Sequence, residues 1–333
     1  MKIITAVTLI KIQGPGMQNV KKKTNLIITG SSGYVGTALL RKLGDYEVFA
    51  IDRKNLKQEY TNVKFSNFDL STDLEKLKEF SSLLETIVVH LAAARSDDAD
   101  ESDYKKDNIR ATENFLKNLN PGHIKLFIHV GSVAALDGEK IIAEKRRIIG
   151  SDDWYRVTKY EQQQLIEDWS VANNVPLVIL APSAVYDSDA KSNQTNVGRL
   201  ERAIRIFKIL PRIDTKKSLT PMNMLIDAIK SFVEQNQYYK NENSPLKIQR
   251  FLVIERPVIS INEICKRRFG AKYTFWFPGL FVFLLLLAKI IKTLRIAKYI
   301  PLTQNRIVKL FKSTDYQVNS KYGDWHAHET NSH

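Results

Sequence analysis

The sequence has very little cysteine, and this excludes several classes of protein. Its single cysteine, Cys265, rules out an intramolecular disulfide and every zinc site built from several thiolates. His90 and His129 lie in strand-like runs, where we expect packed core residues, and the polar tail 326–333 reads as solvated chain. We therefore expect no metal site, and the low cysteine content fits a cytoplasmic location.

Acidic residues are also scarce, because 36 Asp and Glu face 50 Lys and Arg and leave a net charge of +14. The excess concentrates in three regions, 1–23, 199–217 and 289–333. Such patches favour anionic partners, namely nucleic acid, membrane headgroups or a phosphorylated small molecule, although a solvated surface explains them as well. No nucleic-acid-binding module is present, so we expect no nucleic-acid partner.

No apolar run is long enough to cross a bilayer. The longest, 280–288, is well short of the roughly 20 residues that a spanning helix needs. We expect it to form a buried helix in the C-terminal half. The alternative is peripheral contact with an anionic membrane through 280–298, where four basic residues follow the run. Residues 1–16 lack a small-residue cleavage site and indicate a tail rather than a signal peptide.

From Asn25 onward, short apolar runs alternate with helical patterns. This alternation is typical of an α/β fold with a parallel sheet that helices cover on both faces. We divide the chain into an N-terminal extension (1–22), a nucleotide-binding domain (23–185) and a mainly substrate-binding domain (186–333). Segments near 219–254 are expected to return to the sheet. The expected strands are 25–30, 46–52, 63–70, 83–94, 124–132 and 175–183, and the expected helices are 34–44, 108–120 and 154–174.

Glycines stand together between the first expected strand and helix, in TGSSGYVG. A dinucleotide needs small residues there, because the turn is tight and backbone N–H groups approach the pyrophosphate at the helix N-terminus. The position between strand and helix makes the motif specific. It predicts a Rossmann doubly wound sheet whose cofactor-binding residues include Gly30, Ser32, Gly33, Tyr34, Val35 and Gly36.

The ends of the next two strands supply further cofactor candidates. Asp52 ends the second strand, where a carboxylate accepts hydrogen bonds from the ribose hydroxyls and repels a 2′-phosphate. The cofactor is therefore expected to be NAD(H) rather than NADP(H), a preference that the neighbouring Arg53 can soften. Asp69 and Leu70 end the third strand and are expected near the adenine, although a plain strand-to-turn aspartate explains Asp69 equally well.

Two Tyr–Lys pairs with a spacing of four residues compete for a catalytic role. Tyr155 and Lys159 open a predicted helix and share one of its faces, and Ser132 ends a predicted strand on the edge where parallel sheets bind ligands. Tyr60 and Lys64 have no hydroxyl partner and no cofactor motif nearby. We therefore assign catalysis to Ser132, Tyr155 and Lys159.

The three groups suit proton transfer at a sugar or alcohol oxygen. A tyrosine hydroxyl titrates at about pH 10, and a neighbouring ammonium group favours its phenolate form. A phenolate formed this way can move the proton while a hydride passes to or from the nicotinamide. The serine hydroxyl then stabilises the charge on the same oxygen.

Together these motifs resemble the extended short-chain dehydrogenase/reductase family, in its nucleotide-sugar epimerase/dehydratase group. The resemblance covers about residues 24–325 and includes FDL, HLAAA, DNIRATENFL and APSAVYD. It implies a homodimer formed through 108–119 and 155–172, with NAD and a nucleoside-diphosphate sugar as ligands. It places Leu91, Ala92, Ala93, Asn108, Pro182 and Val185 at the cofactor. It places Ala94, Ser132, Asn196, Arg199 and Lys217 at the substrate.

Segments of the C-terminal half are similar to enzymes of bacterial surface-polysaccharide and lipopolysaccharide synthesis. Among these, the UDP-N-acetylquinovosamine 4-dehydrogenase type reduces a 4-keto-6-deoxy sugar nucleotide, and we expect this oxidoreductase reaction at C4. Ala181 and Asp187 depart from the Arg and Gly that are common in the family, which leaves the sugar open. A nucleotide-sugar 4-epimerase is the first alternative. A non-catalytic NAD-binding sensor and a membrane-associated sterol-type dehydrogenase are the others.

Overall fold

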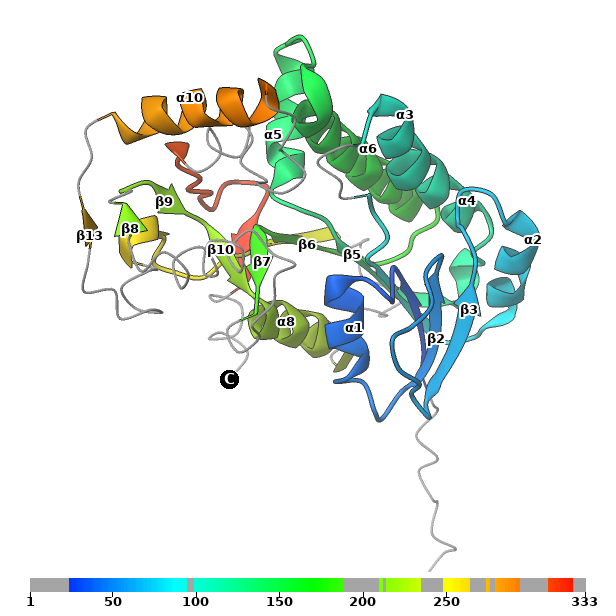
Figure 1. Ribbon diagram of the computed structural model, residues 1–333. Helices are drawn as coiled ribbons and strands as arrows, with labels where there is room; N and C mark the ends of the chain where they lie inside the picture. The colour runs from blue at the N-terminus through cyan, green and yellow to red at the C-terminus, as the bar shows by residue number, and fades with distance from the viewer. Residues whose placement is uncertain are drawn as a thin grey trace, which may run out of the picture.

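The structure is a computed structural model, and it confirms the α/β fold class expected from the sequence. An eight-stranded parallel sheet lies between layers of helices (Figure 1). The structure describes residues 24–94, 99–187, 210–211, 214–234, 248–263, 274–275, 279–293 and 311–325.

The strands of the large sheet follow the order β14-β11-β6-β5-β4-β1-β2-β3, and every neighbouring pair is parallel. The chain order reverses between β1 and β4, and a doubly wound sheet binds ligands at such a switch point, beyond the carboxyl ends of its strands. The strands are β1 (Asn25–Thr29), β2 (Glu47–Asp52), β3 (Val63–Asn67), β4 (Thr86–His90), β5 (Ile124–Val130), β6 (Leu177–Pro182), β11 (Ile248–Val253) and β14 (Gly323–Asp324).

Helices cover both faces of the sheet because the strands are apolar on both faces. In β1, Leu26 and Ile28 join one core cluster while Ile27 joins the other. The first cluster packs under α1 (Tyr34–Leu40) and α8 (Met222–Glu234). The second lies under α4 (Ala111–Lys117) and α6 (Gly150–Ala172), and α5 (Ala134–Ala143) packs against α6.

Short elements connect these layers. α2 (Leu74–Leu77), η1 (Lys78–Ser82), α3 (Glu101–Tyr104), η2 (Lys105–Arg110) and η3 (Pro121–His123) lie on the α4 side of the chain. Three strand pairs lie outside the large sheet: β7 (Ala184–Tyr186) with β10 (Leu219–Pro221), β9 (Lys216–Lys217) with β12 (Ile259–Ser260), and β8 (Leu210–Pro211) with β13 (Thr274–Phe275).

Helix α10 (Leu280–Thr293) differs from the buried helix that the sequence predicted. Ala288 and Ile291 are buried, but four large apolar side chains on the outer face are between 51% and 57% exposed, namely Val282, Phe283, Leu286 and Ile290. The apolar run exceeds what one buried face can absorb. Within the described ranges, no helix is both long enough and apolar enough to cross a membrane. Residues 1–16 lie outside these ranges.

The C-terminal strand is held to the sheet by an aromatic cluster. Trp325 is fully buried beside β14, and its ring centroid lies 5.3 Å from that of Phe232 in α8 and 6.1 Å from that of Phe251 in β11. This contact joins the end of the described chain to the core under α8.

We expect the Trp325→Ala substitution to lower the free energy of unfolding by about 3–5 kcal/mol, because it leaves a large cavity between α8 and β11. Urea denaturation followed by circular dichroism measures the loss. The control is Val318→Ala, a truncation of a half-exposed side chain in the same segment. It should change the unfolding free energy by no more than about 0.5 kcal/mol. Equal effects of the two substitutions would contradict the packing role of Trp325.

Candidate active site

The turn after β1 approaches the segment after β4 so closely that only glycine fits. Gly30 has φ +70°, and a Cβ there would lie 2.8 Å from the backbone N of Ala92 and from the backbone C of Leu91. A Cβ on Gly36 would lie 2.4 Å from the carbonyl oxygen of Gly30. These two contacts account for the glycines at both ends of the motif. They leave the turn as bare backbone, which is the surface a pyrophosphate requires.

Asp52 stands at the carboxyl end of β2, beside the glycine turn. Its Oδ2 accepts a hydrogen bond of 3.0 Å from the backbone N–H of Ser32, and its Oδ1 accepts one of 2.9 Å from Lys54 N–H. An ionised carboxylate can accept about four hydrogen bonds, so acceptor capacity remains for two ribose hydroxyls. No side-chain hydrogen bond caps the adjoining helix α1, whose N-cap is Gly33. These residues fit the adenosine and diphosphate portions of NAD.

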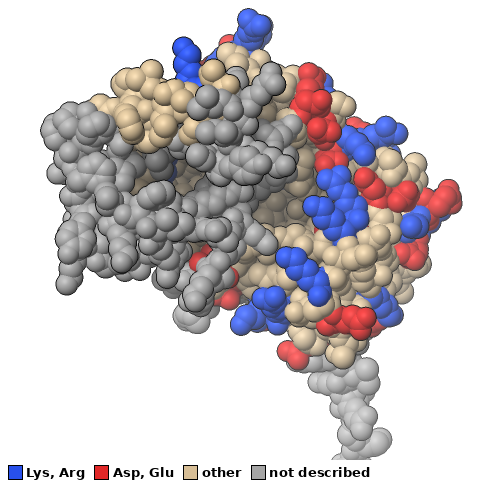
Figure 2. Space-filling view, in the orientation of Figure 1, with Lys and Arg blue, Asp and Glu red and all other residues tan. Residues whose placement is uncertain are grey.

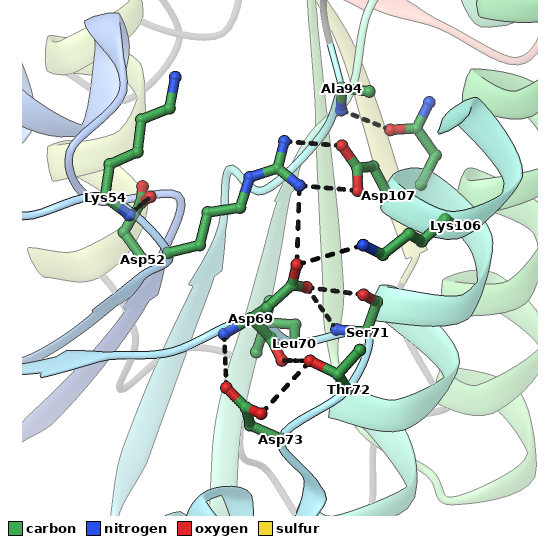
Figure 3. A network of polar contacts seen from close by, with 12 residues as sticks. Asp52, Lys54, Asp69, Leu70, Ser71, Thr72, Asp73, Ala94, Lys106 and Asp107 are labelled. Carbon is green, nitrogen blue, oxygen red and sulfur yellow. Dashed lines mark hydrogen bonds and ion pairs between the residues drawn. The ribbon is translucent and has the colours of Figure 1, made fainter. Parts of the chain in front are cut away.

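Asp69 and its neighbours form the rim next to Asp52 (Figure 3). Asp69 Oδ1 accepts hydrogen bonds from Ser71 N–H at 2.8 Å and from Ser71 Oγ–H at 2.7 Å. Its Oδ2 lies 3.6 Å from Lys106 Nζ. Burial raises the pKa of Asp69, but the Ser71 hydrogen bonds and nearby cations outweigh it and hold the pKa below its usual value. Leu70, beside it, is buried.

Asn108 joins the cofactor edge to the helix that carries the Tyr–Lys pair. It is fully buried in η2, a π-helical turn between α3 and α4, and such turns often occur at functional sites. Its Oδ1 accepts a 2.7 Å hydrogen bond from Ala94 N–H, and its Nδ2 donates a 3.0 Å bond to Thr158 Oγ1. The amide therefore connects the segment after β4 to α6.

The three predicted catalytic residues come from two neighbouring elements. Ser132 directly follows β5, and its Oγ accepts a 3.1 Å hydrogen bond from Ala134 N–H. Tyr155 and Lys159 are one turn apart in α6, where the Tyr155 ring packs against Ala94 and Tyr104. Their positions place them at the edge that holds the glycine turn.

The predicted lining residues Pro182 and Val185 lie beside the Ser132 segment. The Pro182 carbonyl, at the end of β6, accepts a 3.0 Å hydrogen bond from Val133 N–H. Val185 is buried in β7, which pairs with β10. The C-terminal ends of β5 and β6 are therefore tied together next to Ser132.

Gln162 is the polar contact of Lys159, and sequence reasoning missed it. Lys159 is buried, and its Nζ donates a 2.6 Å hydrogen bond to Gln162 Oε1. The Gln162 amide nitrogen donates to the carbonyl of Ala92 at 3.1 Å and to Thr112 Oγ1 at 2.9 Å. The available signal was the i,i+3 spacing from Lys159, but a run of three glutamines does not indicate which one turns inward.

Two neutral histidines lie near the Lys159 ammonium. His90 and His129 are fully buried, as expected for core residues, and Thr29 Oγ1 lies 2.8 Å from His90 Nδ1. Burial, together with the charge of Lys159, lowers the pKa of His90 to about 3 and that of His129 well below its usual value. In the part of the chain that is described, no three His, Cys, Asp or Glu side chains gather as for a metal ion.

The remaining candidates do not extend the described site. Lys217 lies in β9, where its Nζ donates to the carbonyl of Lys312, and burial next to Lys312 lowers its pKa to about 8. Asn196 and Arg199 lie outside the described residues. Lys64 of the competing pair forms an ion pair of 2.6 Å with Glu47 on the β2–β3 side of the sheet.

Comparison with known proteins agrees with this geometry. The family described as "NAD dependent epimerase/dehydratase family" has a model that matches residues 26–218. The chain belongs to this family. It is thus an NAD-dependent enzyme, and the extended short-chain dehydrogenase/reductase resemblance seen in the sequence is confirmed.

Two relatives and one solved structure illustrate the similarity. An Escherichia coli O157:H7 protein named N-acetyl-alpha-D-glucosaminyl-diphospho-ditrans,octacis-undecaprenol 4-epimerase is 22% identical over 247 residues, or 72% of this chain and 70% of the relative. A Vibrio cholerae UDP-glucose 4-epimerase is 27% identical over 233 residues, 64% of this chain and 68% of the relative. The UDP-glucuronic acid 4-epimerase from Bacillus cereus in complex with NAD superposes with a TM-score of 0.55 at 20% identity, covering 76% and 86% of the two chains.

The buried ammonium has a consequence for stability. Burial lowers the pKa of Lys159 to about 7 in the folded protein, while the unfolded chain keeps a lysine pKa of about 10.4. Between these values the unfolded state binds the extra proton, so the unfolding free energy should rise with pH. We expect urea denaturation of cofactor-free protein to show this rise from pH 7 to pH 9.5. His90 and His129 titrate below this window.

Lys159→Met should flatten the pH dependence, because methionine keeps the length and removes the charge. The control Lys140→Met removes a lysine from α5 and should keep the rise. An equal slope in wild type and Lys159→Met would show that Lys159 carries no lowered pKa.

Proposed function

We propose that the protein is a 4-epimerase acting on a hexose or N-acetylhexosamine whose C1 is joined to a diphosphate. The observation that carries the proposal is the meeting of Ser132, Tyr155 and Lys159 with the glycine turn at one edge of the sheet. The two relatives named above are 4-epimerases, which supports inversion at C4.

In the proposed reaction, NAD when bound accepts a hydride from the sugar and returns it. Tyr155 takes the proton from the C4 hydroxyl and gives it back to the same oxygen after the sugar carbon is inverted. Ser132 Oγ–H donates a hydrogen bond to that oxygen and stabilises its developing charge. Lys159, held by Gln162, places positive charge below the tyrosine and favours its phenolate form.

We propose that the sugar lies between the nucleotide-binding domain (23–185) and the C-terminal segment 186–333. The basic region 199–217 is suited to the diphosphate, because cationic side chains form strong charge-assisted hydrogen bonds with phosphate oxygens. Lys217, Asn196 and Arg199 are the candidate contacts there. A homodimer through 108–119 and 155–172 remains part of this proposal.

The second candidate is the C4 oxidoreductase that reduces a 4-keto-6-deoxy-N-acetylhexosamine nucleotide in surface-polysaccharide synthesis. It uses the same three residues but differs in hydride accounting, since a reductase must release NAD and bind NADH in every turnover. The similarity of the C-terminal segments to such enzymes favours it. The sensor is not carried forward because the family consists of enzymes, nor is the sterol-type dehydrogenase.

We further propose that α10 lies on an anionic membrane surface, where a lipid-linked sugar would be found. Its four outward apolar side chains form one face, and the exposed Lys289 stands beside them. Figure 2 shows uncharged surface over this helix. An interfacial helix combines such an apolar face with basic residues that bind anionic headgroups. The lipid diphosphate in the name of the Escherichia coli relative agrees with this arrangement.

Three substrates separate the candidates when product sugars and nicotinamide absorbance are followed together. A 4-epimerase converts UDP-N-acetylglucosamine or polyprenyl-diphosphate N-acetylglucosamine into the galacto epimer with no net change in NADH. A reductase consumes NADH stoichiometrically with the UDP-linked 4-keto-6-deoxy sugar. In either case, Tyr155→Phe should lower turnover by about 10²–10⁴-fold and leave cofactor binding unchanged. The control Tyr160→Phe, on the same helix, should retain turnover. Near-normal turnover of Tyr155→Phe would remove it from the mechanism.

Flotation with vesicles tests α10. We expect the protein to bind phosphatidylglycerol vesicles at low salt, and Phe283→Gln with Leu286→Gln should abolish most of the bound fraction because both side chains are half exposed on the outer face. Ile142→Gln with Ile149→Gln, also exposed but on α5 and the loop after it, is the matched control. Absence of vesicle binding by the wild type, or equal binding by both variants, would refute the membrane proposal.

A further inference from the structure

Arg53 occupies a position from which it can hold a 2′-phosphate. It directly follows Asp52, at the end of β2, and its side chain is 48% exposed. An arginine near this strand end is how doubly wound domains accommodate the extra phosphate of NADP. The family uses NAD, so the free guanidinium would work against the required selectivity.

The guanidinium is already paired with two carboxylates. Its NH1 donates a 2.8 Å hydrogen bond to Asp107 Oδ1 and its NH2 donates a 2.7 Å bond to Asp107 Oδ2, the bidentate geometry that suits arginine. Asp69 Oδ2 lies 3.8 Å away. The hydrogen bond with Asp107 is the main reason that the pKa of Arg53 is raised. Figure 3 shows Asp69 and Asp107 on the two sides of this contact.

Asp107 is held more firmly than its partner. Its side chain is only 15% exposed, and it lies in the π-helical turn η2 next to the buried Asn108. On the same turn, Lys106 pairs with Asp69 rather than with Asp107. Together, Asp52, Asp69 and Asp107 place three carboxylates against two cations, so the rim carries net negative charge.

We propose that Asp107 is a specificity-determining residue that sets the preference for NAD over NADP. It engages both terminal nitrogens of Arg53 and adds a negative charge close to the position of the 2′-oxygen beside Asp52. NADP would have to break the bidentate pair and enter a net negative rim. The proposal concerns the cofactor and is independent of which sugar reaction the enzyme performs.

The test measures dissociation constants of NADH and NADPH by fluorescence titration, without any sugar substrate. Asp107→Asn keeps the shape of the side chain but cannot form the bidentate ion pair. We expect NADPH to bind at least about tenfold more tightly to this variant than to the wild type, because a charge-assisted hydrogen bond from Arg53 becomes available to the 2′-phosphate. NADH affinity should change little.

Controls separate the role of Arg53 from a general change in charge. Glu113→Gln removes one negative charge from the neighbouring helix α4 and should leave the NADPH affinity unchanged. The double variant Arg53→Met, Asp107→Asn should lose the gain. An unchanged NADPH affinity in Asp107→Asn would overturn the proposal, as would a gain that persists in the double variant. Asp107→Ala should reproduce the gain, and unaltered NADH affinity shows that each variant is folded.

Discussion

The parallel arrangement of the central sheet is the constraint on which the site depends. Because every neighbouring pair of strands is parallel, the carboxyl ends of β1, β2, β4, β5 and β6 all lie on one edge. The glycine turn, Asp52, the segment after β4 and Ser132 each follow one of these ends. Residues separated by a hundred positions in the sequence are thereby brought to the edge where the cofactor binds.

A second requirement is that a lysine ammonium be buried close to this edge. Burial of a charged group without polar partners is costly. The fold meets the requirement with Gln162, which accepts from Lys159 and donates to Ala92 and Thr112. Asn108 makes a parallel connection from Ala94 to Thr158. These two amides couple α6 to the segment after β4, so the helix that carries Tyr155 and Lys159 is positioned relative to the cofactor edge by buried hydrogen bonds.

The two ends of the proposed ligand are treated differently by the molecule. The adenosine side is lined by Asp52, Asp69 and Asp107, whose charges are balanced locally by Arg53 and Lys106. The diphosphate of the sugar is proposed to meet the basic region 199–217. The exposed apolar face of α10 adds a third type of surface, for which a lipid headgroup region is the proposed partner. Enzyme chemistry, cofactor choice and membrane contact thus depend on separate parts of the chain.

Local sequence patterns determined the fold class and the cofactor, because strand alternation, the glycine turn and the Tyr–Lys spacing depend on residues close together in the chain. They did not determine which polar groups pair across the sheet. Gln162 was missed since its partners Ala92 and Thr112 are distant in sequence, and Arg53 could be placed beside Asp52 but not paired with Asp107. The exposure of α10 was also decided by tertiary structure. An apolar run shows that a helix avoids water, but only packing decides how much of its surface the protein itself can cover.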